Sequence, residues 1–370
     1  MGRPTDDVAE LAFEYRPLLL FDSEEDYGPL DVDTFLAQTG GRPPHQGCHR
    51  AAIEADPCQA VRSPHDLHTF GRNFDYLDFD GYRRHGSDVP PDIADENRQR
   101  IYYRATPDGD RLYLQYWWFQ RFNNSPVRLA ILCLPGISIQ ETTCFDHEGD
   151  WEGVTVTVRG EGNGYRGERV TYTGHGWPHG YSYEWSALDA AGSLVDDTHP
   201  KVFVAYGSHA AYPVECVSGC TELDFRIHLP DWVGLVLLIA AALVMLLYRN
   251  RWIAGALIVL GVLVIAAPGI PVPDGHHDGK TEWAGNVDGW CDTHDCLFEL
   301  PELGDGTPIS WNAYPGEWGK AECTSFKGFC VRSAGPTGPA AKCRGKAPKC
   351  RYLRPDLHTP GSAGELTRAG

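Results

Sequence analysis

The segment 145–154, FDHEGDWEGV, is the densest group of chemically capable side chains in the chain. Asp150 and Glu152 stand two positions apart, so in an extended strand both carboxylates project from the same face. His147 lies three positions before Asp150, where a turn brings its imidazole toward the same point. Two neighbouring carboxylates repel each other unless a cation or a shared proton offsets their charge. The spacing therefore predicts a divalent-metal site at His147, Asp150 and Glu152.

The donor types narrow the choice of metal. Carboxylate oxygens with one imidazole favour Mg²⁺ or Ca²⁺, and Mn²⁺ and Zn²⁺ remain possible. His175, in TGHGW, and His209, in GSHAAYP, stand beside predicted strands and are candidate additional site residues. Histidines at such positions also occur as ordinary loop or core residues.

Two other interpretations of this cluster stay open. In a metal-dependent hydrolase, Glu152 or Asp150 would act as base and His175 or His209 as acid or orienting group. The sequence contains no nucleophile elbow, HExxH helix or P-loop, so an enzyme is the less favoured interpretation. In a structural protein, the cluster would only stabilise the start of the strand.

The segments around the cluster have the pattern of short β-strands. Residues 101–105 and 111–119 flank the turn sequence PDGD, and residues 154–159 alternate strictly between apolar and polar. Residues 169–173 and 201–206 are two further short runs that are β-branched or aromatic. Several short strands joined by turns rich in Gly and Pro predict a mainly β domain resembling a β-sandwich.

The charge of the chain excludes one class of partner. The 370 residues include 32 basic and 50 acidic side chains, which gives a formal net charge of −18. A nucleic-acid-binding protein needs a basic surface to displace counterions from phosphates, so no nucleic-acid partner is expected.

Two apolar runs interrupt this polar chain. Residues 232–248 carry no charge, and a second run begins at Trp252 after the short link Arg249–Arg251. Each run is close to the ~20 residues that cross a hydrocarbon layer. We expect an inserted transmembrane hairpin at 229–273, with two buried core helices as the alternative. The protein is then a two-pass protein of the cell membrane, with the lipid bilayer as a partner.

The twelve cysteines fall in close pairs outside this hairpin, which favours disulfides and an exoplasmic globular part. Zinc is the competing interpretation, because Cys291 and Cys296 enclose further potential ligands. The N-terminal segment lacks the pattern of a signal peptide, which speaks against the exoplasmic side.

Most of the chain outside the hairpin resembles the family of vacuolar protein sorting-associated protein 62. The resemblance rests on YLQYWWFQRFNN, HEGDWEGVTV and HPKVFVAYGSHAAYP, on an early YRPLLLFDSEEDYGPLDVDTFL, and on WNAYPGEWG with GPTGP near the end. It implies one β-rich domain in two parts, 1–228 and 274–370, separated by the hairpin 229–273. The second part ends in an irregular tail rich in cysteine pairs.

The spacing H-x-x-D-W-E is also similar to the G-H-R-H-D-W-E motif of the necrosis- and ethylene-inducing-like cytolysins. The resemblance implies that His147, Asp150 and Glu152 match metal-site residues on a β-sandwich that engages membrane glycolipids. Gly149 replaces the second His of that motif, and a further metal-site Asp falls near Asn123 or Asn124. An Asn carbonyl still ligates Ca²⁺ or Mg²⁺, although it removes a charge.

These observations predict a membrane-anchored, metal-binding β-sandwich protein. Its expected role is that of a binding module for a glycan or a lipid headgroup, with the hydrolase and the purely structural protein as alternatives.

Overall fold

The computed structural model describes parts of the chain between residues 6 and 360. The residues that it describes are 6–25, 27–33, 45–48, 57–60, 75–78, 100–123, 147–162, 164–172, 181–217, 221–227, 239, 243, 252–253, 257–258, 270–273, 277–282, 297–300, 318–319, 322–326, 329–333, 338–339 and 359–360. Contacts divide the chain into two compact units, one formed by 1–220 with 274–370 and the other by 221–273.

The first unit is mainly β. Its helices among the described residues include α1 (Asp6–Glu14) and α3 (Trp185–Ala190). The strands of its two main sheets are β1 (Leu18–Phe21), β5 (Ile101–Asp108), β6 (Arg111–Asn123), β7 (His147–Glu161), β8 (Gly164–Tyr172), β9 (Tyr181–Glu184), β10 (Leu194–Val195), β11 (His199–Val204), β12 (Ala211–Tyr212), β15 (Thr281–Glu282), β16 (Leu297–Glu299) and β19 (Thr359–Pro360).

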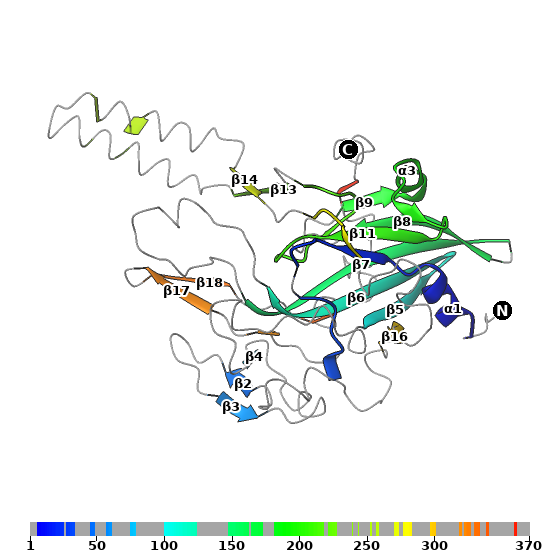
Figure 1. Cartoon of the computed structure of the whole chain (residues 1–370), viewed down its shortest axis with the longest axis horizontal. Helices are drawn as coiled ribbons and strands as arrows, with labels where there is room; N and C mark the ends of the chain where they lie inside the picture. The colour runs from blue at the N-terminus through cyan, green and yellow to red at the C-terminus, as the bar shows by residue number, and fades with distance from the viewer. Residues whose placement is uncertain are drawn as a thin grey trace. The chain divides into compact units, whose positions relative to one another are not determined.

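The larger sheet has seven strands in the order β16-β5-β6-β7-β8-β9-β19. Strands β5 to β9 pair antiparallel in sequence order, and the arrows of β6, β7 and β8 are the long ones among them in Figure 1. The β5–β6 hairpin turns at Gly109, whose positive φ of 65° suits a residue without a Cβ. The predicted strands at 101–105, 111–119, 154–159 and 169–173 are confirmed as parts of β5 to β8, apart from Thr173, which lies outside the described residues.

The smaller sheet has five strands in the order β10-β11-β1-β15, with β12 also paired to β11. Strands β1 and β11 are parallel, with Leu19 opposite Val202, whereas β15 runs antiparallel to β1. Of the predicted strand at 201–206, residues 201–204 are confirmed as part of β11, whereas Ala205 and Tyr206 already belong to the loop that follows it. Both main sheets include strands that follow residue 273, because β15 joins the smaller sheet and β16 and β19 join the larger one.

One hydrophobic core lies between the two sheets. Alternate residues of β6 and β7 point into it, as their period of two requires, and β1, β11 and both helices cover them. The inward side chains of β6 and β7 in this core are Leu112, Leu114, Tyr116, Trp118, Val154, Val156 and Val158. A core that both sheets line is the arrangement of a β-sandwich, so the predicted fold class is confirmed at this level.

Other described strands form shorter sheets. A three-stranded sheet is formed by β2 (His45–Cys48), β3 (Pro57–Ala60) and β4 (Asp75–Asp78), and a hairpin by β17 (Glu322–Phe326) and β18 (Phe329–Ser333). Cys216 is disulfide-bonded. Its predicted partner, Cys220, and the side chains of all other cysteines lie outside the described residues.

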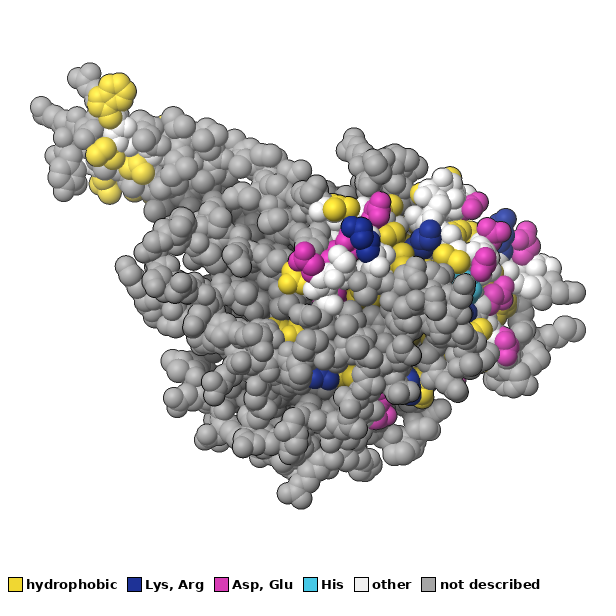
Figure 2. Space-filling view, in the orientation of Figure 1, with side chains coloured by type: hydrophobic (Ala, Val, Ile, Leu, Met, Phe, Trp, Pro, Cys, Tyr) yellow, Lys and Arg dark blue, Asp and Glu magenta, His cyan; other side chains and the backbone are white. Residues whose placement is uncertain are grey.

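The unit 221–273 contains the two-stranded sheet of β13 (Thr221–Ile227) and β14 (Ile270–Pro273). Several large apolar side chains of this unit are exposed; they are Ile239, Leu243, Trp252, Ile253 and Ile258 (Figure 2). Among the described residues, no helix has both the length and the apolar character that crossing a membrane requires. Most of the predicted hairpin 229–273 lies outside those residues.

Candidate functional site

The candidate site lies where β7 begins. Asp150 and Glu152 are paired in register with Gln120 and Trp118 of β6, so all four residues occupy the inner face of the larger sheet. Both carboxylates are buried, with 3% of Asp150 and 7% of Glu152 exposed. The strand therefore brings the two predicted carboxylates to one face, beyond the apolar part of the core.

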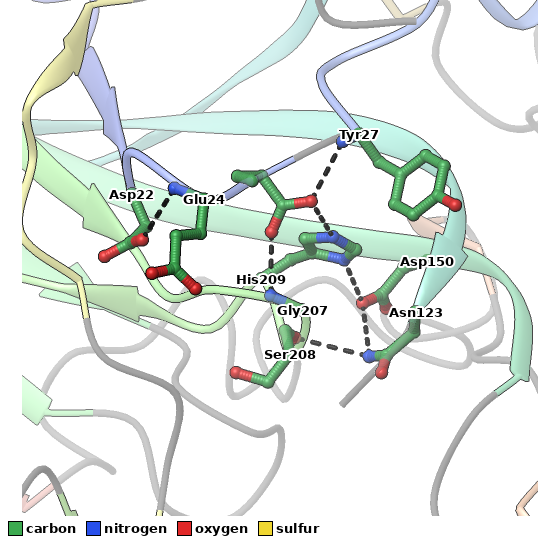
Figure 3. Close-up of polar contacts among 9 residues, drawn as sticks. Asp22, Glu24, Tyr27, Asn123, Asp150, Gly207, Ser208 and His209 are labelled. Carbon is green, nitrogen blue, oxygen red and sulfur yellow. Dashed lines mark hydrogen bonds and ion pairs between the residues drawn. The ribbon is translucent and has the colours of Figure 1, made fainter. Parts of the chain in front are cut away.

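Three donors hold the carboxylate of Asp150. The Nδ2 group of Asn123 donates to Oδ2 over 2.8 Å, and Nδ1 of His209 lies 3.0 Å from the same oxygen. Oδ1 accepts from the backbone N–H of Trp151 over 2.9 Å. Asn123 also donates to the backbone carbonyl of Ser208 over 3.3 Å, which ties β6 to the 205–210 loop (Figure 3). The carboxylate is thus held in one orientation.

His209 lies between two carboxylates. Its Nε2 atom is 3.4 Å from Oε1 of Glu25, on the opposite side of the ring from Asp150, and the residue is fully buried. The loop that carries it, between β11 and β12, is closed by hydrogen bonds between the backbones of Ala205 and Ala210 and of His209 and Ala205. His209 itself has a positive φ of 56°.

Glu25 is the second anchor of the 205–210 loop. Its Oε2 atom accepts from the backbone N–H of Gly207 over 2.7 Å, and Oε1 accepts from that of Tyr27 over 2.9 Å. Sequence reasoning missed Glu25. The available signal was the acidic DSEED sequence directly after the apolar strand LLLF.

The charge state of His209 follows from these neighbours. Burial alone would lower the pKa of its imidazole, but the carboxylate of Glu25 and the hydrogen bond with Asp150 outweigh burial. Together they raise the pKa to about 10, so the ring is a buried cation at neutral pH. With each nitrogen directed at a carboxylate, His209 acts as a positioning residue for Asp150 and Glu25.

A second polar cluster fixes the beginning of the acidic segment that follows β1 and contains Glu25. The carboxylate of Asp278 accepts from the backbone and the hydroxyl of Ser23, over 2.9 and 2.7 Å. It also accepts from the backbone N–H of Lys280, over 3.0 Å, and pairs with its Nζ atom at 3.1 Å. In turn, the backbone N–H of Asp278 donates to Asp22 over 2.8 Å. These contacts connect the segment after β1 to the segment before β15.

Burial would raise the pKa of Asp278, but the hydrogen bonds from Ser23 and Lys280 outweigh it. The pKa of this carboxyl is lowered to about 2. Asp278 is thus a buried hydrogen-bond acceptor.

Gly149 sits inside β7 between His147 and Asp150 with a positive φ of 61°. A Cβ at this position would lie 1.8 Å from the backbone oxygen of Trp318. Both the conformation and the space therefore require glycine here. The second His of the cytolysin motif cannot be accommodated at this position with the present backbone.

The predicted site residues are only partly brought together. Asp150, Asn123 and His209 form one hydrogen-bonded network, and Glu152 lies two residues along the strand. The backbone of His147 begins β7, but its side chain, like all of His175, lies outside the described residues. Among the side chains that are described, no group of three or more His, Cys, Asp or Glu is arranged to hold a metal ion.

Two side chains on the same sheet face as the carboxylates have polar atoms that are unpaired among the described residues. Gln120 and Trp118 are fully buried on the inner face of β6. In the described part of the chain, neither amide atom of Gln120 has a hydrogen-bond partner, and neither does Nε1 of Trp118. Oriented carboxylates and an unpaired amide oxygen fit a hard divalent cation, whereas a protonated His209 does not fit as its ligand.

Comparisons with known proteins find only a weak structural similarity. No family model and no curated protein matches the chain. Solved structures that resemble it include a necrosis and ethylene inducing protein 2 from the causal agent of cocoa's witches' broom disease, with 15% identity and a TM-score of 0.26 over 55% of this chain and 61% of that one. Another is NLPPya in complex with glucosamine, with 13% identity and a TM-score of 0.29 over 54% of this chain and 63% of that one.

NLPPya in complex with mannosamine gives the same identity and TM-score over 57% of this chain and 69% of that one. The chain thus spans about three fifths of the first two of these structures. At such TM-scores the likeness does not assign the chain to that family. The resemblance to the vacuolar protein sorting-associated protein 62 family stays a prediction.

Proposed function

We propose that the protein is a binding module in which a divalent cation, held by Asp150, Glu152 and His147, recognises a glycan or a lipid headgroup. The observation behind this proposal is the buried pair Asp150 and Glu152 on one face of β7, with Asp150 held in a fixed orientation. Carboxylates that ligate metals are characteristically hydrogen-bonded by neighbouring residues, as Asp150 is by Asn123 and His209.

The chemistry of the donors fits Mg²⁺ or Ca²⁺ best. Both ions prefer oxygen ligands and keep positions that exchange water for other oxygens. A bound ion would offer such positions to the hydroxyl or phosphate oxygens of a ligand. The protein's own contribution is to hold Asp150 in place through His209 and Asn123, and to hold the 205–210 loop through Glu25.

A binding role is favoured over hydrolysis by the position of His209. A general acid must come within hydrogen-bond reach of the substrate. His209 is fully buried and its two nitrogens face Asp150 and Glu25, so it is not placed to deliver a proton to a bound molecule. His175, the other candidate acid, lies outside the described residues.

We also propose that the apolar segment 229–273 anchors this module in the cell membrane as a two-pass hairpin, with the globular part on the exoplasmic side. The exposed apolar side chains of the unit 221–273, with Trp252 90% exposed, support a lipid environment for this segment. Large apolar patches on a protein surface are typical of contacts with membranes or other proteins.

The experiment is a measurement of bound metal in the purified full chain and in the double variant Asp150→Asn with Glu152→Gln. We expect the wild-type protein to retain a divalent ion and the variant to lose it, while both remain in the membrane fraction. A control variant, Asp189→Asn with Glu184→Gln, removes two exposed carboxylates elsewhere and should retain the ion. Equal metal in the two proteins would show that these carboxylates do not hold it.

The purely structural interpretation makes a different prediction for the same proteins. The hydrogen bonds of Asp150 and the two neighbours of His209 are what a network that only fixes strand and loop would show. In that case the wild-type protein holds no divalent ion. The double variant then unfolds at a lower temperature, and adding Mg²⁺ or Ca²⁺ changes neither melting curve.

A further inference from the structure

Gln120 has a buried side chain whose hydrogen-bonding groups are not used by any of the described residues. The residue is 0% exposed, and in the described part of the chain neither its carbonyl oxygen Oε1 nor its Nε2 group has a hydrogen-bond partner. A buried amide without partners is costly, and buried polar atoms in proteins are nearly always satisfied by protein, water or a bound ion. A partner other than the described residues is therefore needed beside Gln120.

The position of Gln120 indicates what that partner is. The residue is directly opposite Asp150 in the β6–β7 register, and Glu152 is opposite Trp118, two residues away on the same face. Residues opposite each other in an antiparallel pair have Cβ atoms about 5 Å apart, so their side chains can share one bound group. The carbonyl oxygen of Gln120 thus lies on the face that carries two buried carboxylates.

We propose that Oε1 of Gln120 is a further ligand of the divalent cation proposed at Asp150 and Glu152, which makes the site one that prefers Ca²⁺ or Mg²⁺. This inference rests on the proposed function and adds to it a residue that the sequence motif does not contain. Amide carbonyl oxygens are regular ligands of Ca²⁺, which binds six to eight oxygens.

Nε1 of Trp118 and Nε2 of Gln120 are also without hydrogen-bond partners in the described part of the chain. Both groups are donors, so each needs an acceptor, and a cation accepts no hydrogen bond. The proposed ion therefore accounts for Oε1 of Gln120 and not for these two N–H groups.

The test compares Gln120→Leu and Gln120→Glu with the wild-type full chain. Ca²⁺ and Mg²⁺ binding is measured by titration calorimetry after removal of metal with EDTA, and melting temperatures are measured with and without each ion. We expect Gln120→Leu to weaken binding about tenfold or more, similar to the loss of a supporting group at other metal sites. Gln120→Glu keeps an oxygen ligand and adds a charge, so it should bind the ion at least as tightly as the wild type.

The melting temperatures give a readout that a merely structural amide would not produce. In EDTA, Gln120→Glu adds a buried negative charge near Asp150 and should melt below the wild type, and the added ion should restore it. The matched control is Gln115→Leu, because Gln115 is a buried amide of the same strand on the opposite face. It should lower the melting temperature equally with and without the ion and leave the affinity unchanged.

The outcomes separate this inference from the proposed function. If the wild type and Gln120→Leu bind the ion equally while Asp150→Asn with Glu152→Gln does not, the metal site stands and Gln120 is not its ligand. If the wild-type protein binds neither ion, both the metal site and this inference are wrong. Equal melting shifts of Gln120→Leu in EDTA and in Ca²⁺ would indicate that ordered water alone pairs with the amide.

Discussion

At the scale of single residues, the decisive feature is a charged imidazole shared by two carboxylates from distant parts of the chain. Glu25, Asp150 and His209 are all buried, and their charges stabilise one another only because they are close together. A buried pair of this kind adds little stability compared with apolar packing, but breaking it by removing one partner is expensive. The main effect of the network is therefore to fix the relative positions of these three side chains.

Replacing His209 with Asn tests this role with little backbone strain. Asn tolerates the positive φ of position 209, so the main effect is to remove the cation between Glu25 and Asp150. We expect a loss of about 3–5 kcal/mol in the free energy of unfolding, measured by urea denaturation in EDTA.

The control is His199→Asn, which changes a half-buried histidine on β11 whose Nδ1 atom lies 3.1 Å from the backbone oxygen of Arg16. It should cost much less. If His209→Asn costs less than about 1 kcal/mol, the ring is not an essential counter-charge. Adding Glu25→Gln to His209→Asn should recover part of the loss, because one of the two uncompensated charges is then removed.

At the scale of elements, the site depends on hydrogen bonds between segments far apart in the sequence. The loop after β1 is held to the 205–210 loop by Glu25 and Gly207, and to the 277–280 segment by Ser23 and Asp278. These contacts place the end of β1, the loop before β12 and the entry to β15 around the beginning of β7.

The contact between Asp278 and Ser23 should give the protein a specific acid sensitivity. The pKa of Asp278 is lowered from 3.8 to about 2, so its contribution to stability is present above pH 4 and is lost as the pH falls from about 4 to 2. We expect this contribution to be about 1 kcal/mol, because Lys280 is largely exposed and its pairing is screened by solvent.

The measurement is the free energy of unfolding between pH 2 and pH 6 for the wild type and Asp278→Asn. The variant should lose stability near neutral pH and show a shallower decline below pH 4. Asp189→Asn, at an exposed position on α3, is the control and should follow the wild-type curve. Parallel curves for the wild type and Asp278→Asn would contradict the assignment.

The glycine within β7 makes a second prediction at this scale. Gly149→Ala introduces a Cβ that would clash with the backbone of Trp318, and it also strains the positive φ. We expect it to lower the free energy of unfolding by about 2 kcal/mol or more, the range of large steric changes in a packed region.

The matched control is Gly162→Ala at the exposed β7–β8 turn, which has nearly the same φ but open space around its Cα. It measures the cost of the conformation alone, expected to be about 1 kcal/mol. Equal losses for the two variants in urea denaturation would show that the contact with Trp318 is not limiting.

The strands and the site differ in how far the sequence predicts them. Strands β5 to β8 follow from alternation and turn residues, which are local signals, and the same period of two puts Asp150 and Glu152 on one face. Glu25 and Gln120 were not predicted, because their roles depend on which strands and loops become neighbours. Glu25 meets a residue 182 positions away, and no local pattern reports such a contact.

At the scale of the whole molecule, the chain leaves the first unit and returns to it at adjacent points. The backbones of Cys216 and His277 pair with each other over 3.0 and 2.8 Å, on either side of the unit 221–273. Strands β15, β16 and β19, which follow the return, belong to the two main sheets. The apolar insertion therefore separates two stretches of sequence that build one β-sandwich.

This geometry predicts that the unit 221–273 is dispensable for folding of the sandwich. None of its described side chains belongs to the core between the sheets. Because Cys216 and His277 pair directly, a short Gly-Ser linker from Cys220 to Asp274 spans the gap. We expect the shortened protein to unfold with a free energy within about 1 kcal/mol of the full chain in detergent, because distant sites contribute independently.

The same variant tests the proposed anchor. The full chain should sediment with membranes and require detergent for extraction, whereas the shortened chain should remain in the aqueous phase with an unchanged affinity for the divalent ion. A control with the linker inserted after Gly162, in the exposed β7–β8 turn, should still sediment with membranes. If the shortened chain stays with the membranes, the apolar segment is not the anchor, and if it fails to fold, the sandwich depends on the insertion after all.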